Sequence, residues 1–390
     1  MIRIGIAGMG AAGRAFLPAF HAQSGFDLVA VADPLPAIRE AMASEQGLAT
    51  FDDLSSMLAG IQLDAVYLAT PTDMHRIHAE MAIAAGKHVL VEKPVAVEIE
   101  ETLSMVNAAQ KAGVVLAVGH SHSYDLPIHK MRELIEGGAL GRVRMINTMC
   151  FTDWVYRPRR PEELDVGLGG GVTFRQGAHQ FDILRLLGGG MVKSVRATAF
   201  DWDATRSTVG AHVVYLQFEN GTVGTAIYNG YGCFSSSELC GGVGEWGFNQ
   251  PVEPGKMRHD FKNNSAEDEL ERKRRRAKNA ITEIDTPFQP HFGLTIVSCE
   301  KGDIRQSPEG LYVYTENGCE EIKLSTETSP RYLVLSEFRD AILGVAKCLH
   351  DGRWGLSNLE ICTAALESSN TGREVFLSHQ VAVPTLSHHS

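Results

Sequence analysis

The first 120 residues alternate between short Val-rich apolar segments and helical segments, and this alternation constrains the fold more than any other feature. The apolar segments are "IRIGIAG", "DLVAVAD", "DAVYLAT", "KHVLVEK" and "VVLAVGH". Short apolar strands that alternate with helices predict a parallel sheet covered on both faces. Because crossovers between parallel strands are right-handed, we expect an α/β, doubly wound Rossmann domain over residues 1–121.

The pattern changes in residues 122–390. "PIHKMRELIEGGALG" reads as a helix that ends at glycine, and "RVRMINTMCF" alternates like a strand. Later strand-like segments contain the hairpin signals "FENGTV" and "TENGCE". Strands that are separated from helices in this way predict an α+β domain with an antiparallel sheet. We expect two helices, at about 331–350 and 358–371, to close the chain.

Length and composition limit the possible functions. The chain has 390 residues, enough for two domains, and a net charge of −11, which argues against a nucleic-acid partner. No apolar run approaches the roughly 18 residues that a membrane span needs, and the N-terminus does not resemble a signal peptide. Seven scattered cysteines without a CxxC pair suggest reduced thiols, and therefore a cytoplasmic protein.

A glycine-rich loop follows the first predicted strand. "GIAGMGAAGRAF" places Gly8, Gly10 and Gly13 in GxGxxG spacing, and Asp33 follows Gly13 by twenty residues, at the end of the second strand. This context predicts a dinucleotide whose pyrophosphate lies at a helix N-terminus. The Asp33 carboxylate would accept hydrogen bonds from ribose and repel a 2′-phosphate, so we expect NAD; Arg39 is the one nearby feature that could favour NADP. The remaining loop residues expected at the cofactor are Met9, Ala11 and Ala12.

A second glycine-rich segment, "GGGVTFRQGAHQFD" at 169–182, leads into a predicted helix. Arg175 and His179 are four residues apart, so they should share one face of an α-helix. Asp182, one turn later, either orients His179 or bonds to backbone. "GHSHSYD" places His120, His122 and Tyr124 after the fifth strand, where we favour contacts with substrate over a metal site, cofactor stacking or simple packing.

These segments together resemble the Gfo/Idh/MocA oxidoreductases. The matching stretches are "GIAGMGAAG", "ATPTDMHRIHAEMAIAAGKHVLVEKP" and "GGGVTFRQGAHQFD". The resemblance implies that Lys93 of the "EKP" motif and His179 act on the substrate carbinol without a metal. It also implies a homodimer or homotetramer that assembles through the open face of the second domain's large sheet. The cofactor contacts that it adds are Thr70, Pro71, His75, Glu92 and Lys93.

One position departs from many members of that family. Arg175 stands where polyol dehydrogenases of the family have an aspartate that binds sugar hydroxyls. An arginine cannot accept a hydrogen bond, but it offers a planar fork to a carboxylate. "DWVYRPRRPEELD" adds Arg157, Arg159 and Arg160, although these could also form surface or interdomain ion pairs. We therefore expect a small anionic substrate.

Three further stretches narrow the resemblance. "HSHSYDLPIHKMRELIEGGALG", "TDWVYRPRRPEELDVGLGGG" and "PHFGLTIVSCEKGDIRQSPEGLYVY" are similar to the phthalate 4,5-cis-dihydrodiol dehydrogenase branch. The implied reaction is NAD-dependent oxidation of a carboxylated cis-dihydrodiol to 4,5-dihydroxyphthalate. The alternatives are a dehydrogenase of sugar acids, inositol or other polyols, and a catalytically silent NAD-dependent regulator.

The segment over residues 249–290 stands apart from both patterns. It contains "EDELERKRRRAKNAI", which is highly charged and helical in propensity. A solvated surface helix is the favoured interpretation, and an arm that contacts a neighbouring subunit or covers the site is the alternative.

Overall fold

The computed structural model describes residues 1–22, 24–251, 253–263, 269–273, 275 and 286–384. The chain divides into two compact units. The first unit contains residues 1–120, 271–284 and 331–359, and the second contains 121–270, 285–330 and 360–390.

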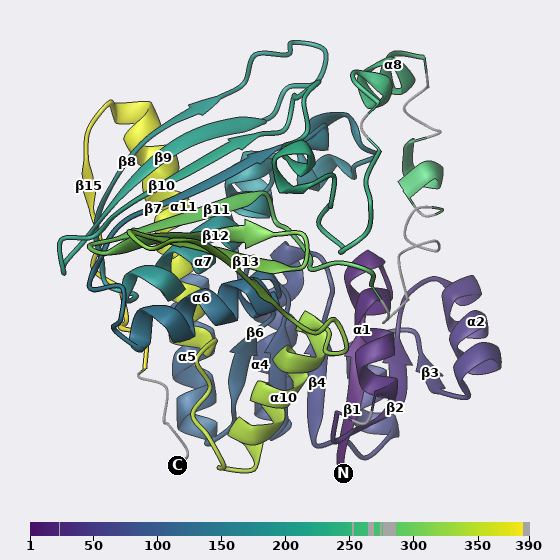
Figure 1. The fold of residues 1–390 in the computed structure, drawn as a ribbon. Helices are drawn as coiled ribbons and strands as arrows, with labels where there is room; N and C mark the ends of the chain where they lie inside the picture. The colour runs from purple at the N-terminus through teal and green to yellow at the C-terminus, as the bar shows by residue number, and fades with distance from the viewer. Residues whose placement is uncertain (23, 252, 264–268, 274, 276–285, 385–390) are drawn as a thin grey trace. The chain divides into compact units, whose positions relative to one another are not determined.

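The first unit is built on a six-stranded sheet in which all neighbouring strands are parallel (Figure 1). Its strand order is β3-β2-β1-β4-β5-β6, so the direction of winding reverses between β1 and β4. All four side chains of β4 are buried, as a sheet covered on both faces requires. The strands are β1 (Ile2–Ala7), β2 (Phe26–Ala32), β3 (Ala49–Phe51), β4 (Ala65–Leu68), β5 (His88–Val91) and β6 (Leu116–Val118).

Helices connect successive strands of this sheet, which confirms the predicted doubly wound domain. The sequence pattern missed β3, which has only three residues and no fully buried side chain. The helices are α1 (Ala11–His21), α2 (Pro36–Gln46), α3 (Leu54–Gly60), α4 (His75–Ala84), α5 (Ile99–Ala112) and α10 (Pro330–Ile342), and a short 3₁₀ turn, η1 (Thr72–Met74), precedes α4.

Residues 331–359 belong to the first unit, whereas the sequence pattern placed everything after residue 121 in the second domain. Helix α10 packs there because Phe338 stacks on Phe26 at 5.7 Å between ring centroids. The Arg339 guanidinium donates to the carbonyl of Ser24 at 3.2 Å, and the amide of Val118 donates to the carbonyl of His350 at 2.8 Å. These contacts join segments that are more than 200 residues apart in sequence, so no local sequence pattern could predict them.

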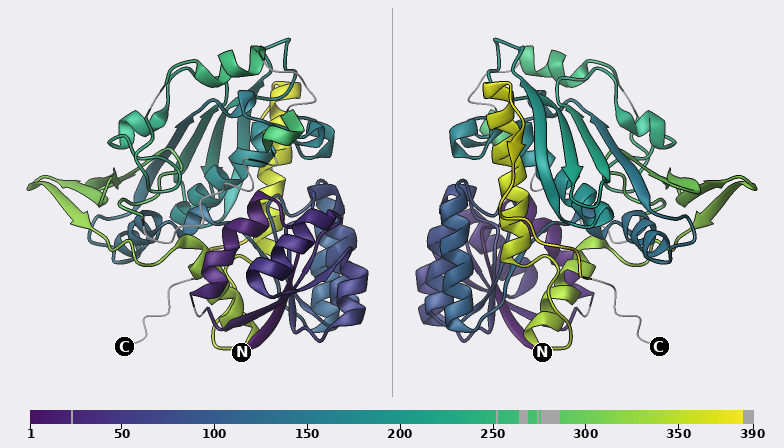
Figure 2. Two further views of the ribbon diagram at one scale, coloured as in Figure 1. Left: turned by 90° about the vertical axis from the view of Figure 1, so that its right-hand side faces the viewer. Right: turned by 90° about the vertical axis from the view of Figure 1, so that its left-hand side faces the viewer.

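The second unit is built on a nine-stranded sheet in the order β14-β13-β12-β11-β7-β10-β9-β8-β15. Only the β7–β10 pair is parallel, so the prediction of a mostly antiparallel sheet is confirmed. Figure 2 shows the β13–β14 hairpin at one edge of this sheet. The strands are β7 (Val143–Phe151), β8 (Val192–Phe200), β9 (Ala211–Phe218), β10 (Val223–Asn229), β11 (Leu294–Cys299), β12 (Gly302–Ser307), β13 (Gly310–Thr315), β14 (Gly318–Lys323) and β15 (Val375–Phe376).

Helices cover one face of the large sheet. Helix α7 packs against β7 and β10, and α6 packs against β13 (Figure 1). Every side chain of α7 is buried. Helix α11 begins in the first unit and continues in the second. The helical elements are α6 (Leu126–Glu136), α7 (Ala178–Gly188), α8 (Lys256–Lys262) and α11 (Gly352–Thr371), with short turns η2 (His122–Tyr124), η3 (Trp154–Tyr156), η4 (Pro161–Glu163), η5 (Val166–Leu168) and η7 (Ser236–Cys240).

The helix that carries the glycine-rich motif is not a regular α-helix. Residues Thr173–Gly177 form a π-helical turn, η6, directly before α7. A π turn inserts an extra residue into the helical repeat. Arg175 pairs with Glu163 and His179 packs on Phe292, and their shared helix face stays a prediction.

Most of the charged segment 267–281 lies outside the described residues. Residues 269–273 are helical, and Glu269 accepts hydrogen bonds from the backbone amide of Arg159 at 2.7 Å and from the Arg206 guanidinium. The segment is therefore anchored at Glu269. All seven cysteines lie in the described part of the chain as free thiols, and no helix there is long and apolar enough to span a membrane.

Candidate active site

The glycine loop of the first unit has the geometry that a dinucleotide pyrophosphate needs. Gly8 has φ +92°, and a Cβ there would lie 2.6 Å from the carbonyl oxygen of Ala69. A Cβ at Gly13 would lie 2.2 Å from the carbonyl oxygen of Gly8, so α1 packs closely on its strand only because that residue is glycine. A Cβ at Gly10 would meet nothing within 4 Å, which leaves open space at the N-terminus of α1 for an anionic group.

Asp33 and Arg39 are both tied to the backbone near this loop. The Asp33 carboxylate is 6% exposed and accepts the amide protons of Met9 at 2.9 Å and Leu35 at 3.0 Å. A carboxylate has about four acceptor positions, so it retains capacity for ribose hydroxyls. The Arg39 guanidinium donates to the Asp33 carbonyl at 2.7 Å, so this residue is engaged with the backbone rather than directed toward a 2′-phosphate.

The residues after β4 and β5 hold each other in place at the carboxyl edge of the sheet. The two ring nitrogens of His75 lie 2.9 Å from the carbonyl of Thr70 and 3.0 Å from that of Pro94, so this buried ring links the two loops. The Tyr67 hydroxyl donates to Glu92 at 2.6 Å, and the backbone amide of Lys93 donates to the other Glu92 oxygen at 3.2 Å. Lys93 is half-buried and precedes Pro94 through a cis peptide bond. One cluster at the carboxyl ends of the strands, where such sheets bind ligands, therefore contains the predicted site residues Thr70, Pro71, His75, Glu92 and Lys93.

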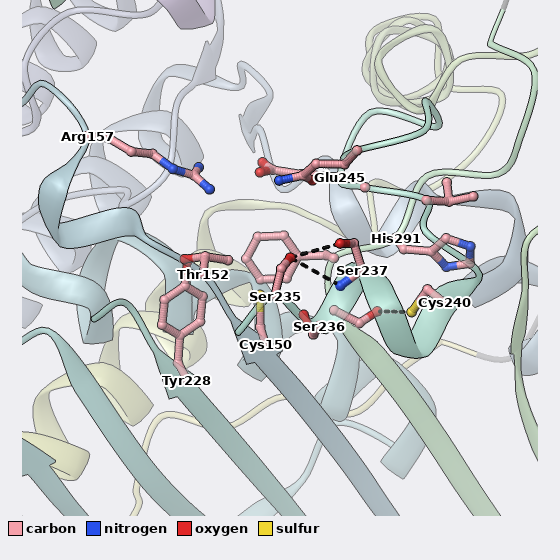
Figure 3. A pocket seen from close by; sticks show the side chains of 15 residues that line it. Cys150, Thr152, Arg157, Tyr228, Ser235, Ser236, Ser237, Cys240, Glu245 and His291 are labelled. Carbon is pink, nitrogen blue, oxygen red and sulfur yellow. Dashed lines mark hydrogen bonds between the residues drawn. The ribbon is translucent and has the colours of Figure 1, made fainter. Parts of the chain in front are cut away.

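The second unit contains a recess near the ends of β7 and β10 (Figure 3). Arg157 and Glu245 extend toward each other from opposite sides of this recess. The hydroxyls of Tyr228 and Thr152, 3.1 Å apart, line it between them. The other lining residues are Cys150, Ser235, Ser236, Ser237, Cys240, Val243, Gly244, Gln250, His291, Phe292 and Gly293.

A histidine pair adjoins this recess. The Phe292 ring, which is part of the lining, lies 4.9 Å from the His179 ring and 4.5 Å from the His122 ring, and the two histidine rings meet edge to face at 4.6 Å. Nδ1 of His122 lies 3.1 Å from Asp125, and Nε2 lies 3.4 Å from Glu245. His122 therefore connects His179 to the carboxylate on the recess wall.

The same carboxylates determine the charge of His122. Burial by itself would lower the pKa of His122, but Asp125 and Glu245 outweigh this effect and raise the pKa to about 9. The ring is therefore a cation near neutral pH, placed between two anions. A fixed charge arrangement of this kind at the edge of a recess is typical of functional sites.

The predicted arginines do not all reach the recess. Arg157 lines it and is paired with Asp153 at 2.6 Å. Arg175, on the π turn, is paired with Glu163 at 3.3 Å, and that carboxylate is 5% exposed. Arg159 lies over the Trp154 ring at 4.0 Å, and Arg160 pairs with Glu162 at 3.0 Å. Protein carboxylates therefore engage most of this positive charge, and Arg157 is the member of the group that also faces the recess.

Other residues highlighted by the sequence lie in the interior. Tyr124 is 3% exposed and stacks on His129 of α6 at 5.4 Å, and its contact with substrate stays a prediction. Asp182 is fully buried on α7. His120 belongs to the first unit, where its Nε2 lies 3.2 Å from the Asn358 amide.

Sequence patterns gave little indication of Glu245, Phe292 or Tyr228. Glu245 lies in "GGVGEWGFNQ", where a single acidic residue among glycines is the only signal. Phe292 lies in a loop and Tyr228 at the end of a strand, and they meet at 6.5 Å only through the sheet. Among the described residues, no group of three or more His, Cys, Asp or Glu side chains is arranged to hold a metal ion.

Comparison with known proteins supports both units. Residues 2–120 match the family model described as "Oxidoreductase family, NAD-binding Rossmann fold", and residues 128–234 match the "GFO/IDH/MocA C-terminal domain". The chain is 40% identical over 377 residues to the 1-carboxy-3-chloro-3,4-dihydroxycyclohexa-1,5-diene dehydrogenase of Comamonas testosteroni, covering 94% of each chain.

Two solved structures are also similar. One is a Bordetella bronchiseptica RB50 protein described as a dehydrogenase, with 38% identity, a TM-score of 0.92, and coverage of 96% of this chain and 100% of that one. The other is the WlbA dehydrogenase of Bordetella pertussis in complex with NADH and UDP-GlcNAcA, with 25% identity, a TM-score of 0.68, and coverage of 97% and 99%. The glycine loop, the matching models of both units and the near full-length relative together place this chain in the Gfo/Idh/MocA family of NAD-dependent oxidoreductases.

Proposed function

We propose that this enzyme oxidises a carboxylated cis-dihydrodiol of a cyclohexadiene ring to a catechol, with phthalate 4,5-cis-dihydrodiol as the specific substrate and 4,5-dihydroxyphthalate as the product. The observation that carries this proposal is the recess with a cation, Arg157, on one side and an acceptor, Glu245, on the other. The Comamonas testosteroni relative supports it, because its name describes a cyclohexadiene with one carboxylate and two hydroxyls.

The chemistry balances with the residues present. The carbinol carbon loses a hydride, and its hydroxyl proton goes to a base, for which Lys93 and His179 are the proposed candidates. The glycine loop and Asp33 would hold NAD⁺, which would supply the hydride acceptor. The ring product tautomerises when the hydrogen on the neighbouring carbon moves to the new carbonyl oxygen, and the aromaticity gained drives the reaction forward.

The position of the substrate carboxylate is the part of this proposal that the geometry sharpens. Arg175 was the leading candidate from sequence, but its guanidinium already has the buried carboxylate of Glu163 as partner. Arg157 is also paired, through Nε with Asp153 at 2.6 Å, but unlike Arg175 it lines the recess, so we assign the substrate carboxylate to Arg157. An arginine and a carboxylate form a charge-assisted, directional pair, which would fix the ring's orientation.

The test is the rate of NADH formation with a carboxylated cis-diol and an uncarboxylated one. Arg157→Met should lower kcat/KM for the carboxylated diol by roughly ten- to a hundredfold more than for the uncarboxylated diol. Arg175→Met is the matched variant and should affect both substrates equally. If Arg175→Met, and not Arg157→Met, selectively impairs the carboxylated diol, Arg175 binds the substrate carboxylate. If the wild type turns over neither diol, the proposed reaction is refuted.

A sugar acid is the second candidate substrate. The WlbA dehydrogenase of Bordetella pertussis was solved with UDP-GlcNAcA, and Arg157 would serve a sugar carboxylate equally well. A panel of sugar acids and inositol in the same NADH assay separates the two candidates. Turnover of any of these substrates would also exclude a catalytically silent regulator.

The assembly and compartment are part of the same proposal. We infer a homodimer or homotetramer that forms through the uncovered face of the nine-stranded sheet, and a cytoplasmic enzyme, for which the free thiols are the supporting observation.

A further inference from the structure

We propose that Glu245 selects vicinal diols by accepting a hydrogen bond from the hydroxyl that is not oxidised, and that it directs the substrate carboxylate to the opposite end of the ring. This inference rests on the proposed function and deepens it. Neither the family match nor the sequence pattern assigns a role to Glu245.

Glu245 lies where it can contact a bound ring. Its carboxylate lines the recess opposite the Arg157 guanidinium (Figure 3), and its side chain is 34% exposed. An ionised carboxylate is an acceptor only, so it binds hydroxyls and repels anions. Arg157 has the opposite preference, since it donates five hydrogen bonds and accepts none. A ring with hydroxyls at one end and a carboxylate at the other therefore has one favoured orientation in the recess.

His122 links Glu245 to His179. His122 lies 3.4 Å from Glu245 through Nε2, and its ring lies 4.6 Å from the ring of His179. The oxygens of a cis-diol are on adjacent carbons and on the same side of the ring. In the proposed orientation, one oxygen is directed toward His179 and the other toward Glu245, on the far side of His122.

His122 and Asp125 hold Glu245 in place. His122 is 7% exposed and bonded on its other side to Asp125, which is 1% exposed. The buried pair Asp125–His122 holds the Glu245 carboxylate in place at the recess wall. His122 is thus a positioning residue, since it acts through Glu245.

A regiochemical rule follows. Diols at ring positions distant from the carboxylate, as in a 4,5-diol of a 1,2-dicarboxylate, satisfy both ends of the recess. A diol adjacent to the carboxylate would bring that anion toward Glu245, and its oxidation should be much slower.

The experiment compares a carboxylated cis-diol with the matching mono-alcohol, which lacks the second hydroxyl. Wild-type enzyme should favour the diol, and Glu245→Met should reduce the diol-to-alcohol ratio of kcat/KM by roughly ten- to a hundredfold, the usual effect of losing a hydrogen bond to a charged group. Glu245→Gln keeps a carbonyl acceptor without the charge and should retain part of the preference. Glu253→Met, at an exposed glutamate of the same unit, is the control and should leave the ratio unchanged.

Binding of product analogues gives the same comparison if the variants are inactive. Calorimetry with dihydroxybenzoate and monohydroxybenzoate should show that Glu245→Met loses its preference for the former. His122→Gln should reduce the preference in the same direction but less, because Glu245 remains. Thermal unfolding and NADH binding confirm that each variant is folded.

The outcomes separate this inference from the proposed function. A diol-to-alcohol ratio unchanged in Glu245→Met overturns the role of Glu245, even if carboxylated diols are good substrates. If the wild type oxidises only uncarboxylated vicinal diols, the proposed substrate is wrong and the ratio is measured on those diols. If it oxidises no vicinal diol, both ideas fail.

Discussion

Asp33 is a carboxylate that stabilises the glycine loop and is predicted to bind the cofactor. It accepts the backbone amides of Met9 and Leu35, and it ends the strand at which ribose is expected. We expect Asp33→Asn to weaken NAD binding and to narrow the preference for NAD over NADP by about tenfold, because a neutral amide no longer repels a 2′-phosphate.

Fluorescence titration of each variant with NADH and NADPH measures this effect. Asp27→Asn, an exposed aspartate of the same strand, is the matched control. If Asp33→Asn keeps the wild-type preference for NADH over NADPH, Asp33 only stabilises the loop and does not select the cofactor.

His291 gives a pH-dependent prediction. Burial lowers the pKa of this 3% exposed histidine to about 4, compared with about 6.5 in an unfolded chain. Between these values the unfolded chain binds more protons than the folded one. The contribution of His291 to the free energy of unfolding is therefore fully present above pH 6.5, and it is lost as the pH drops toward 4, by up to about 1.4 kcal/mol per pH unit. In His291→Gln, the melting temperature should therefore fall less between pH 7 and pH 4.5 than in the wild type.

The control for this experiment is His259→Gln, because His259 is exposed. His212, whose pKa burial lowers to about 3, contributes equally in all three proteins and cancels from the comparison. Parallel melting curves for wild type and His291→Gln across the pH range would contradict a neutral His291 in the folded protein.

At the scale of elements, the glycine-rich motif contains a π turn directly before α7. "GGGVTFRQGAHQFD" has a clear helical pattern, and α7 does form from Ala178. Arg175 of the π turn pairs with Glu163, while His179 of α7 packs on Phe292. A pattern of residue types cannot reveal such a turn, because its hydrogen bonds depend on tertiary packing.

The C-terminal helices differ from their predicted ranges for a related reason. Helix α10 ends at Ile342 rather than near residue 350, and α11 begins at Gly352 rather than 358. The His350 backbone amide bonds to Glu337 at 2.9 Å, and the Trp354 amide bonds to Asp351 at 2.9 Å. These side-chain contacts stabilise a break in the helical pattern that intrinsic propensity alone would continue.

At the scale of the whole molecule, the uncovered face of the nine-stranded sheet is the main unassigned surface. Val213 and Tyr215 of β9 are 45% and 40% exposed, and they pair with Ile227 and Thr225 of β10 on the same face. Met145 of β7, 43% exposed, continues the apolar surface. An apolar sheet face of this extent is typical of a subunit contact.

The prediction is that Val213→Glu converts the proposed oligomer to smaller species, because a charge would be buried at the interface. Light scattering after size-exclusion chromatography measures the mass. Ala204→Glu, at an exposed turn away from the strands, should leave the mass unchanged. Wild-type enzyme that is already a monomer would remove the assignment of this face to self-association.

The sequence by itself determined the cofactor domain, the class of both sheets and the family, because these depend on short-range patterns: strand alternation, glycine spacing and an acidic residue at a fixed distance. Only the tertiary structure decided which arginine faces the recess and which carboxylate opposes it. The sequence favoured Arg175 over Arg157, Arg159 and Arg160. In the structure Glu163 engages Arg175, Glu162 engages Arg160, Trp154 supports Arg159, and Arg157 lines the recess beside Asp153. Glu245 becomes a candidate only because folding brings it to His122, more than 100 residues earlier in the chain. Contacts of that range depend on how the strands pair and how the loops pack, and local sequence carries no record of them.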